Sequence, residues 1–129
     1  MKRVTIILLL LIFGLCMATV AFAADKAAIK KQVDEIAVAI DGGKKADDFK
    51  DAAQKKPYYV FIMEEGGKLM VHPSLAGQSL KKKAEPVYNE CAKATADGKW
   101  VDYMWKGKQK HTYVRKTRSG LIVGSGYSE

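Results

Sequence analysis

The sequence contains little cysteine and little proline, and the scarcity of cysteine excludes a disulfide-stabilised fold. Among 129 residues there are two cysteines, Cys16 and Cys91, and three prolines. Cys16 lies in an N-terminal leader, so Cys91 would be the single cysteine of the exported chain and an intramolecular disulfide is excluded. Cys91 stands in a segment of helical propensity, where we expect it to be buried as a small apolar residue.

The sequence also lacks the common signatures of catalysis and of metal binding. It contains no Gly-x-Ser-x-Gly turn, no phosphate-binding loop and no zinc-ligand spacing. The two histidines, His72 and His111, do not combine with Cys91 into a ligand set of the usual spacing. We therefore predict that the protein is not an enzyme and uses no metal or other cofactor.

The first 23 residues have the features of a secretory signal peptide. Lys2 and Arg3 precede an uncharged run at 4–22, and the segment ends on the small-residue pattern Ala-Phe-Ala at 21–23. We predict a signal peptide at 1–23, a single domain at 24–129, and a periplasmic or secreted product. The alternative is an uncleaved membrane anchor, because the run is nearly long enough to span a bilayer.

Positive charge exceeds negative charge in the chain as a whole. The 22 basic and 14 acidic side chains give a formal charge of +8, which falls to +6 when the two leader charges are removed. Basic residues gather at 81–83 and at 106–110, which permits an alternative function as a basic surface-binding or partner-docking periplasmic protein. Such runs are usually solvated faces, and nucleic acid is not an expected partner of an exported protein.

The region at 25–55 predicts two helices. Asp25 is a suitable N-cap and the pair Gly42-Gly43 a suitable stop for the first helix. A weaker helical segment follows at 45–55. The first helix has one apolar stripe, at spacings of four, three and four residues, formed by Ile29, Val33, Ile36 and Ile40.

After Pro57 the apolar period changes from that of a helix to that of a strand. The turn at 64–67 predicts a hairpin between the first two strands, and Pro86 marks an interruption or a first turn in a helical segment at 80–96. Along 100–105, alternation places Val101, Tyr103 and Trp105 on one face. Two glycines in the last strand, Gly124 and Gly126, would let a neighbour or a ligand approach the backbone. The predicted strands are 58–63, 68–72, 100–105, 110–116 and 121–127.

The order of several short motifs resembles the single Cache domain, which forms the extracytoplasmic sensing modules of bacterial chemoreceptors and histidine kinases. The motifs are the strand at 58–61, the turn at 65–67, His72-Pro73, Gly77 before a helix, Val101-x-Tyr103-x-Trp105, Lys110-x-x-Tyr113-Val114 and the closing 123–127. The resemblance implies an α+β, PAS-like fold with five or six antiparallel strands. A long N-terminal helix would cover one face, and the other would hold a pocket for a small organic acid.

The resemblance and physical chemistry together suggest a candidate ligand site. A lone ammonium among aromatic rings attracts a carboxylate more strongly than it would in water, and Lys110 fits this description. The alternatives are that Lys110 is a solvated lysine, that the tyrosines are core residues with one wet end, and that His72 satisfies the turn that follows it. The candidate residues are Lys110, Tyr103, His72, Tyr58, Tyr113 and Trp105.

We therefore predict an exported sensory domain that captures a small metabolite, with a short-chain carboxylate as the expected ligand. No kinase or methyl-accepting module is evident in the sequence, so a separate signalling partner, such as a membrane receptor or histidine kinase, would receive the signal. The helix at 29–40 offers a surface for a homodimer. Chemotaxis and related signal transduction are the processes that the resemblance implies.

Overall fold

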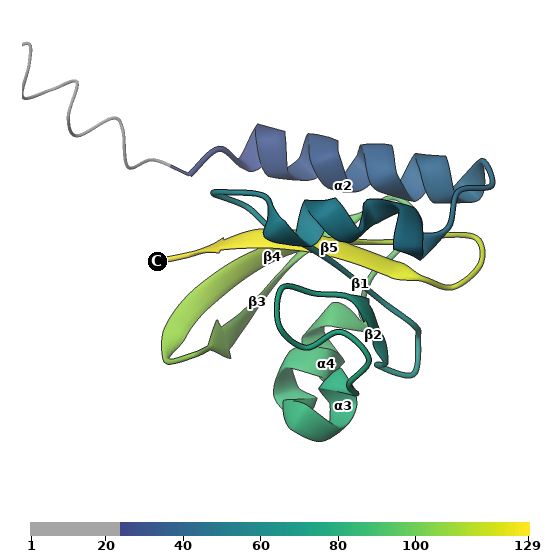
Figure 1. Ribbon diagram of the computed structural model, residues 1–129. Helices are drawn as coiled ribbons and strands as arrows, with labels where there is room; N and C mark the ends of the chain where they lie inside the picture. Colours follow the sequence, from purple (N-terminus) through teal and green to yellow (C-terminus); the bar gives the residue numbers. More distant parts are fainter. Residues whose placement is uncertain (1–23) are drawn as a thin grey trace, which may run out of the picture.

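The computed structural model describes residues 24–129, and the predicted signal peptide at 1–23 lies outside the described residues (Figure 1). Five antiparallel strands form one sheet in the order β2-β1-β5-β4-β3. This confirms the predicted α+β class. The elements are α2 (Lys26–Asp41), η1 (Ala46–Gln54), β1 (Val60–Met63), β2 (Leu69–Val71), α3 (Leu80–Lys83), α4 (Glu85–Cys91), β3 (Lys99–Trp105), β4 (Lys108–Lys116) and β5 (Ile122–Ser128).

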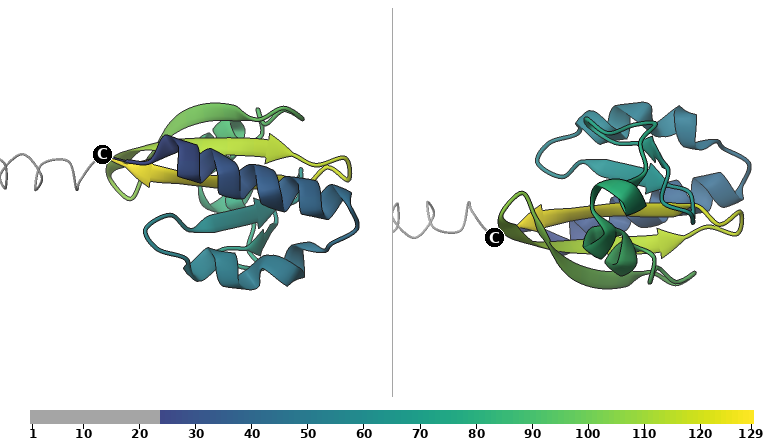
Figure 2. Two further views of the ribbon diagram at one scale, coloured as in Figure 1. Left: turned by 90° about the horizontal axis from the view of Figure 1, so that it is seen from above. Right: turned by 90° about the horizontal axis from the view of Figure 1, so that it is seen from below.

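Helices cover both faces of the sheet. Viewed from above, α2 lies along β5 and β4 while η1 lies beside it over β1 and β2; viewed from below, α3 and α4 cover the opposite side (Figure 2). We call these two sides the α2 face and the α4 face. The predicted long helix on one face is confirmed, and the pair of short helices gives the second face its own core.

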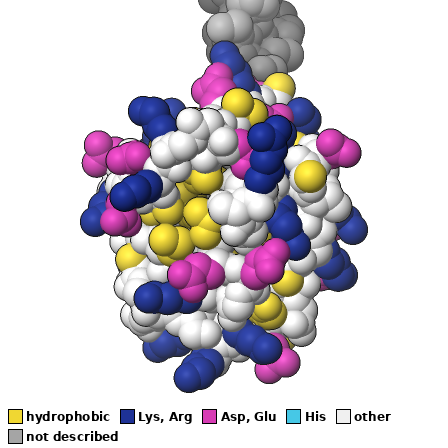
Figure 3. Space-filling view, turned by 90° about the vertical axis from the view of Figure 1, so that its right-hand side faces the viewer, with side chains coloured by type: hydrophobic (Ala, Val, Ile, Leu, Met, Phe, Trp, Pro, Cys, Tyr) yellow, Lys and Arg dark blue, Asp and Glu magenta, His cyan; other side chains and the backbone are white. Residues whose placement is uncertain are grey.

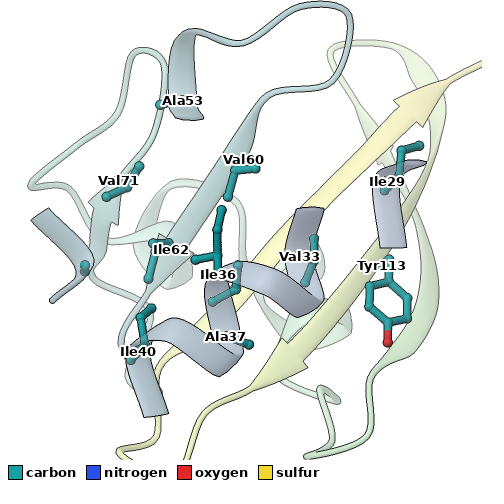
Figure 4. Close-up of a cluster of buried hydrophobic side chains, with 12 residues drawn as sticks. Ile29, Val33, Ile36, Ala37, Ile40, Ala53, Val60, Ile62, Val71 and Tyr113 are labelled. Carbon is teal, nitrogen blue, oxygen red and sulfur yellow. The ribbon is translucent and has the colours of Figure 1, made fainter. Parts of the chain in front are cut away.

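The long helix α2 begins and ends where the sequence predicts. The Asp25 carboxylate accepts a hydrogen bond from the backbone N–H of Ala28 at 3.0 Å, and Gly42 is the C-terminal cap. Figure 4 shows how the stripe packs against residues of β1 and β2 and against Tyr113 of β4. The buried residues of α2 are Ile29, Val33, Ile36, Ala37 and Ile40.

The second predicted helix is a 3₁₀ helix, η1, interrupted by a kink at Phe49, where φ is −112° and ψ is 20°. Ala46 and Ala53 are buried against β1 and β2. These small side chains let the backbone of η1 lie close to the sheet, so the segment completes the core of the α2 face.

Strand alternation divides the core into two clusters. In β1, Val60 and Ile62 belong to the cluster on the α2 face, whereas Phe61 and Met63 belong to the cluster on the α4 face. Every residue of β1 is buried because both faces of this strand are covered.

The two glycines of β5 make room for side chains on the α4 face. A Cβ at Gly124 would lie 2.3 Å from Phe61 Cζ, and a Cβ at Gly126 would lie 2.2 Å from the His111 carbonyl oxygen and 2.6 Å from Thr112 Oγ1. The predicted close approach is therefore confirmed, and the approaching groups belong to the chain itself. Pairing of β5 with both β1 and β4 needs this space.

The short helices α3 and α4 cover the other side of the sheet. Ser79 Oγ accepts the backbone N–H of Lys82 at 3.3 Å at the start of α3, and Pro86 stands in the first turn of α4. Cys91 is fully buried, as predicted.

Within residues 24–129, no helix has the length and apolar character needed to cross a bilayer. At the end of the molecule that faces right in Figure 1, Lys and Arg side chains are interspersed with Asp and Glu around a hydrophobic hollow (Figure 3).

Candidate functional site

An open cleft of about 920 Å³ lies at one end of the sheet, beside the hairpin that joins β3 to β4. It narrows to an inner cavity of about 10 Å³ on the α4 face, which has room for about one water molecule. Four side chains line both spaces and so form the passage between them: Tyr59, His72, Trp105 and Lys110.

Lys110 is the buried cation of this passage. It lies on β4 opposite Tyr103 of β3 and Ser128 of β5, and alternation directs it to the α4 face. Its side chain is 4% exposed. The ammonium donates a hydrogen bond to the Tyr59 hydroxyl at 2.6 Å and lies 4.3 Å from the centre of the Tyr59 ring. The solvated alternative for Lys110 is therefore excluded.

No carboxylate in residues 24–129 lies within ion-pair distance of Lys110. Burial, with a smaller contribution from the nearby ammonium of Lys106, lowers the pKa of Lys110 from its ordinary value of 10.5 to about 8. Buried charges in proteins are normally paired. An unpaired ammonium at the inner end of a cleft is therefore a position that an anion would stabilise.

His72 is held as a hydrogen-bond donor. Its Nδ1 accepts the backbone N–H groups of Ser74 at 3.1 Å and Leu75 at 3.0 Å, which places the proton of the neutral ring on Nε2. Burial, with help from Lys110 and Lys106, lowers the pKa of His72 to about 4. The ring is thus neutral at physiological pH and presents one N–H donor. The turn-satisfying alternative for His72 also holds, since the same ring caps the loop after β2.

Aromatic rings make the wall around these polar groups. The His72 ring lies 5.8 Å from the Tyr59 ring and 6.2 Å from the Trp105 ring, both in edge-to-face geometry. Tyr103 lies deeper, and its hydroxyl accepts a hydrogen bond from Thr112 Oγ1 at 2.9 Å. Burial raises the pKa of Tyr103 far above its ordinary value, so this hydroxyl stays protonated.

The two remaining candidate residues are placed differently from each other. Tyr113 is on the α2 face, where its hydroxyl is 3.0 Å from Asp34 Oδ1 and its ring packs against Trp100. Tyr58 packs on the α2 face and lines the open cleft but not the inner cavity, and its hydroxyl accepts the backbone N–H of Asp25 at 2.8 Å. The cleft and inner cavity together therefore gather Lys110, Tyr103, His72, Trp105 and Tyr58, whereas Tyr113 lies outside both.

Tyr59 is the residue that the sequence analysis did not select. It follows the same alternation as Phe61 and Met63, whereas Tyr58 follows Val60 and Ile62. Side chains alternate between the two faces of a strand, and this alternation could have identified Tyr59. A side chain that contacts Lys110 must lie on the same face as Phe61. The motif alone did not distinguish the two neighbouring tyrosines.

Comparison with known proteins identifies a similar fold but does not assign the chain to a family. No family model matches the sequence, and no curated protein matches it. A methyl-accepting chemotaxis protein from Vibrio parahaemolyticus is similar in structure, with a TM-score of 0.55 and 15% identity over 80% of this chain and 87% of the other. The ligand-binding domain of Mlp24 with asparagine has a TM-score of 0.46 and 12% identity over 66% and 35% of the two chains, too distant to argue from. The chain thus shares its fold with a methyl-accepting chemotaxis protein.

Proposed function

We propose that this protein is an exported sensory domain of the Cache type that binds a small organic acid on Lys110. The observation that carries the proposal is the 4% exposed ammonium, which no carboxylate of residues 24–129 approaches within ion-pair distance. A ligand carboxylate would supply the missing counter-charge. The fold that the chain shares with a methyl-accepting chemotaxis protein supports the sensory part.

The geometry suggests how the acid binds. One carboxylate oxygen replaces the Tyr59 hydroxyl as the partner of the Lys110 ammonium, and the Nε2–H of His72 is available as a second donor. The rings of Tyr59 and Trp105 limit water access, which strengthens the ionic contact. Since the inner cavity has room for about one water molecule, the rest of the ligand lies in the open cleft.

The proposal includes export and a signalling partner. Residues 1–23 are removed as a signal peptide, and residues 24–129 act as one binding domain in the periplasm or outside the cell. The bound form is recognised by a separate membrane receptor or histidine kinase. The role is binding and not catalysis, because the site has a cation and fixed donors but no activated nucleophile: burial raises the pKa of the Cys91 thiol to about 12.

The decisive experiment measures binding of short carboxylates by calorimetry, with a thermal-shift screen to find them. A ligand at about a hundredfold over its Kd adds roughly 2.7 kcal/mol to the free energy of unfolding. We expect Lys110→Met to abolish binding, and Lys99→Met, which removes an exposed lysine from the neighbouring strand, to preserve it. Tyr113→Phe should leave the affinity unchanged.

Two outcomes would overturn the proposal. The first is binding of an acid that survives Lys110→Met. The second is the absence of any stabilising acid, together with salt-sensitive retention on heparin, which would favour the basic surface-binding function. Retention of that kind falls steeply with added salt, whereas capture of one carboxylate at a buried ammonium weakens far less.

A further inference from the structure

The mouth of the cleft carries a second group of positive charge. Lys106 and Lys108 line the open part of the cleft, and both are exposed. Among the described residues, neither has a carboxylate within ion-pair distance. The single acidic side chain that lines the cleft is Glu129, which is 2.8 Å from His111 Nε2. Three ammonium groups therefore face a space with little negative charge of its own.

Lys106 is the member of this group that acts on the inner site. Its charge lowers the pKa of both Lys110 and His72. Its ammonium lies 5.9 Å from the centre of the Trp105 ring, and the Trp105 ring lies 6.2 Å from the His72 ring. Both rings line the cleft together with Lys106 and Lys110.

The hairpin holds Lys106 in this position. Lys106 has φ of 51° and Gly107 has φ of 79°, the pattern of a type I′ turn, in which Asn and Gly are the favoured residues. A lysine in this left-handed conformation is less favourable than asparagine. Asparagine could therefore replace Lys106 without loss of local stability in the turn.

We propose that the ligand is a dicarboxylate, with one carboxylate on Lys110 and the other on Lys106 at the mouth. This inference rests on the proposed function and names its ligand class. A monocarboxylate bound to Lys110 would direct its alkyl end towards the ammonium groups of the mouth. A second carboxylate at that end pairs with Lys106 and, in the open cleft, remains partly hydrated, so its desolvation costs little.

The test compares succinate with butyrate, which have the same number of carbon atoms and differ by one carboxylate. We expect the full-length protein to bind succinate about fivefold more tightly, the ratio that one favourable exposed ion pair gives. Lys106→Asn removes the ammonium and suits the turn, so the variant should fold at least as well as the parent. In this variant the two affinities should become equal, and Lys44→Asn, an exposed loop lysine that does not line the cleft, should leave the ratio unchanged.

The outcomes separate this inference from the proposed function. If both acids bind with equal affinity and Lys110→Met abolishes both, the dicarboxylate inference is wrong and the function stands. If succinate is preferred and the preference survives Lys106→Asn, Lys106 is not the partner of the second carboxylate, and the inference is wrong in that respect. If neither acid binds and no other acid binds through Lys110, the proposed function fails and the inference fails with it.

Discussion

Replacing Lys110 by methionine should stabilise the ligand-free protein, because the substitution removes a buried charge that has no counter-ion. The fall in the pKa of Lys110 from 10.5 to about 8 corresponds to about 3 kcal/mol of destabilisation at pH 7, since each tenfold loss of proton affinity is worth about 1.4 kcal/mol. Loss of the hydrogen bond to Tyr59 costs about 1 kcal/mol. A net gain of about 2 kcal/mol remains, because methionine has a similar length and pairs well with the aromatic wall.

The sign of the pH dependence is fixed by the direction of the shift. The pKa of Lys110 is lower in the folded protein than in the unfolded chain, so the penalty is fully present below about pH 8. Between about pH 8 and 10.5 the unfolded chain holds the proton and the folded protein does not, and stability of the parent rises with pH. The advantage of Lys110→Met should therefore shrink across this window and be lost above it.

Urea and thermal denaturation followed by circular dichroism at pH 7 and at pH 10 measure both effects. At pH 7 the melting temperature of Lys110→Met should rise by roughly 8 °C for a domain of about 100 residues. Lys99→Met is the control, because its lysine is exposed and should change the free energy of unfolding by less than about 0.5 kcal/mol. A Lys110→Met variant that is equally stable or less stable than the parent at pH 7 would refute the buried-charge argument.

Three further predictions follow from the same structure. Affinity for a carboxylate should fall about tenfold per pH unit above about pH 8, because binding needs the protonated Lys110; calorimetry at pH 7 and 9.5 that gives one value would contradict this. Gly126→Ala should destabilise the fold by roughly 1–3 kcal/mol in urea, since the added Cβ meets the His111 carbonyl oxygen at 2.2 Å; a variant of parental stability would show that β4 and β5 separate easily. Cys91 should resist a thiol reagent in the native state at pH 8 and react only in denaturant, as it is fully buried and its pKa is raised to about 12; rapid native-state labelling would contradict the placement of α4.

The local elements could be predicted from sequence because short-range chemistry determines them. The stripe on α2, its Asp25 cap and its Gly42 end each depend on residues a few positions apart. The same holds for the hairpin between β3 and β4. Insertion of β5 between β1 and β4 was not predictable in this way, because Val60 pairs with Ser125 across 65 residues and no turn connects them.

The candidate site was predicted where a residue's face followed from its own strand. Lys110, Tyr103 and Trp105 share a face because β3 and β4 are in register, and the sequence was sufficient for this. Tyr113 lies three residues after Lys110 on β4, so alternation places it on the opposite face, although the motif that contains it suggested a place beside the ligand. Its contact with Asp34 of α2 depends on tertiary packing. Tyr58 and Tyr59 both line the cleft, and the alternation that continues into β1 assigns Tyr59 to the face of Lys110.

The two tryptophans of the chain lie on opposite faces of the sheet. Trp105 belongs to the wall of the cleft, whereas Trp100 packs against Tyr113 and Tyr127 on the α2 face. A Trp100→Phe variant would therefore have one indole, placed beside His72 and Lys106. Its emission spectrum would respond to whatever enters the cleft, so the protein contains its own optical reporter of occupancy and needs no attached dye.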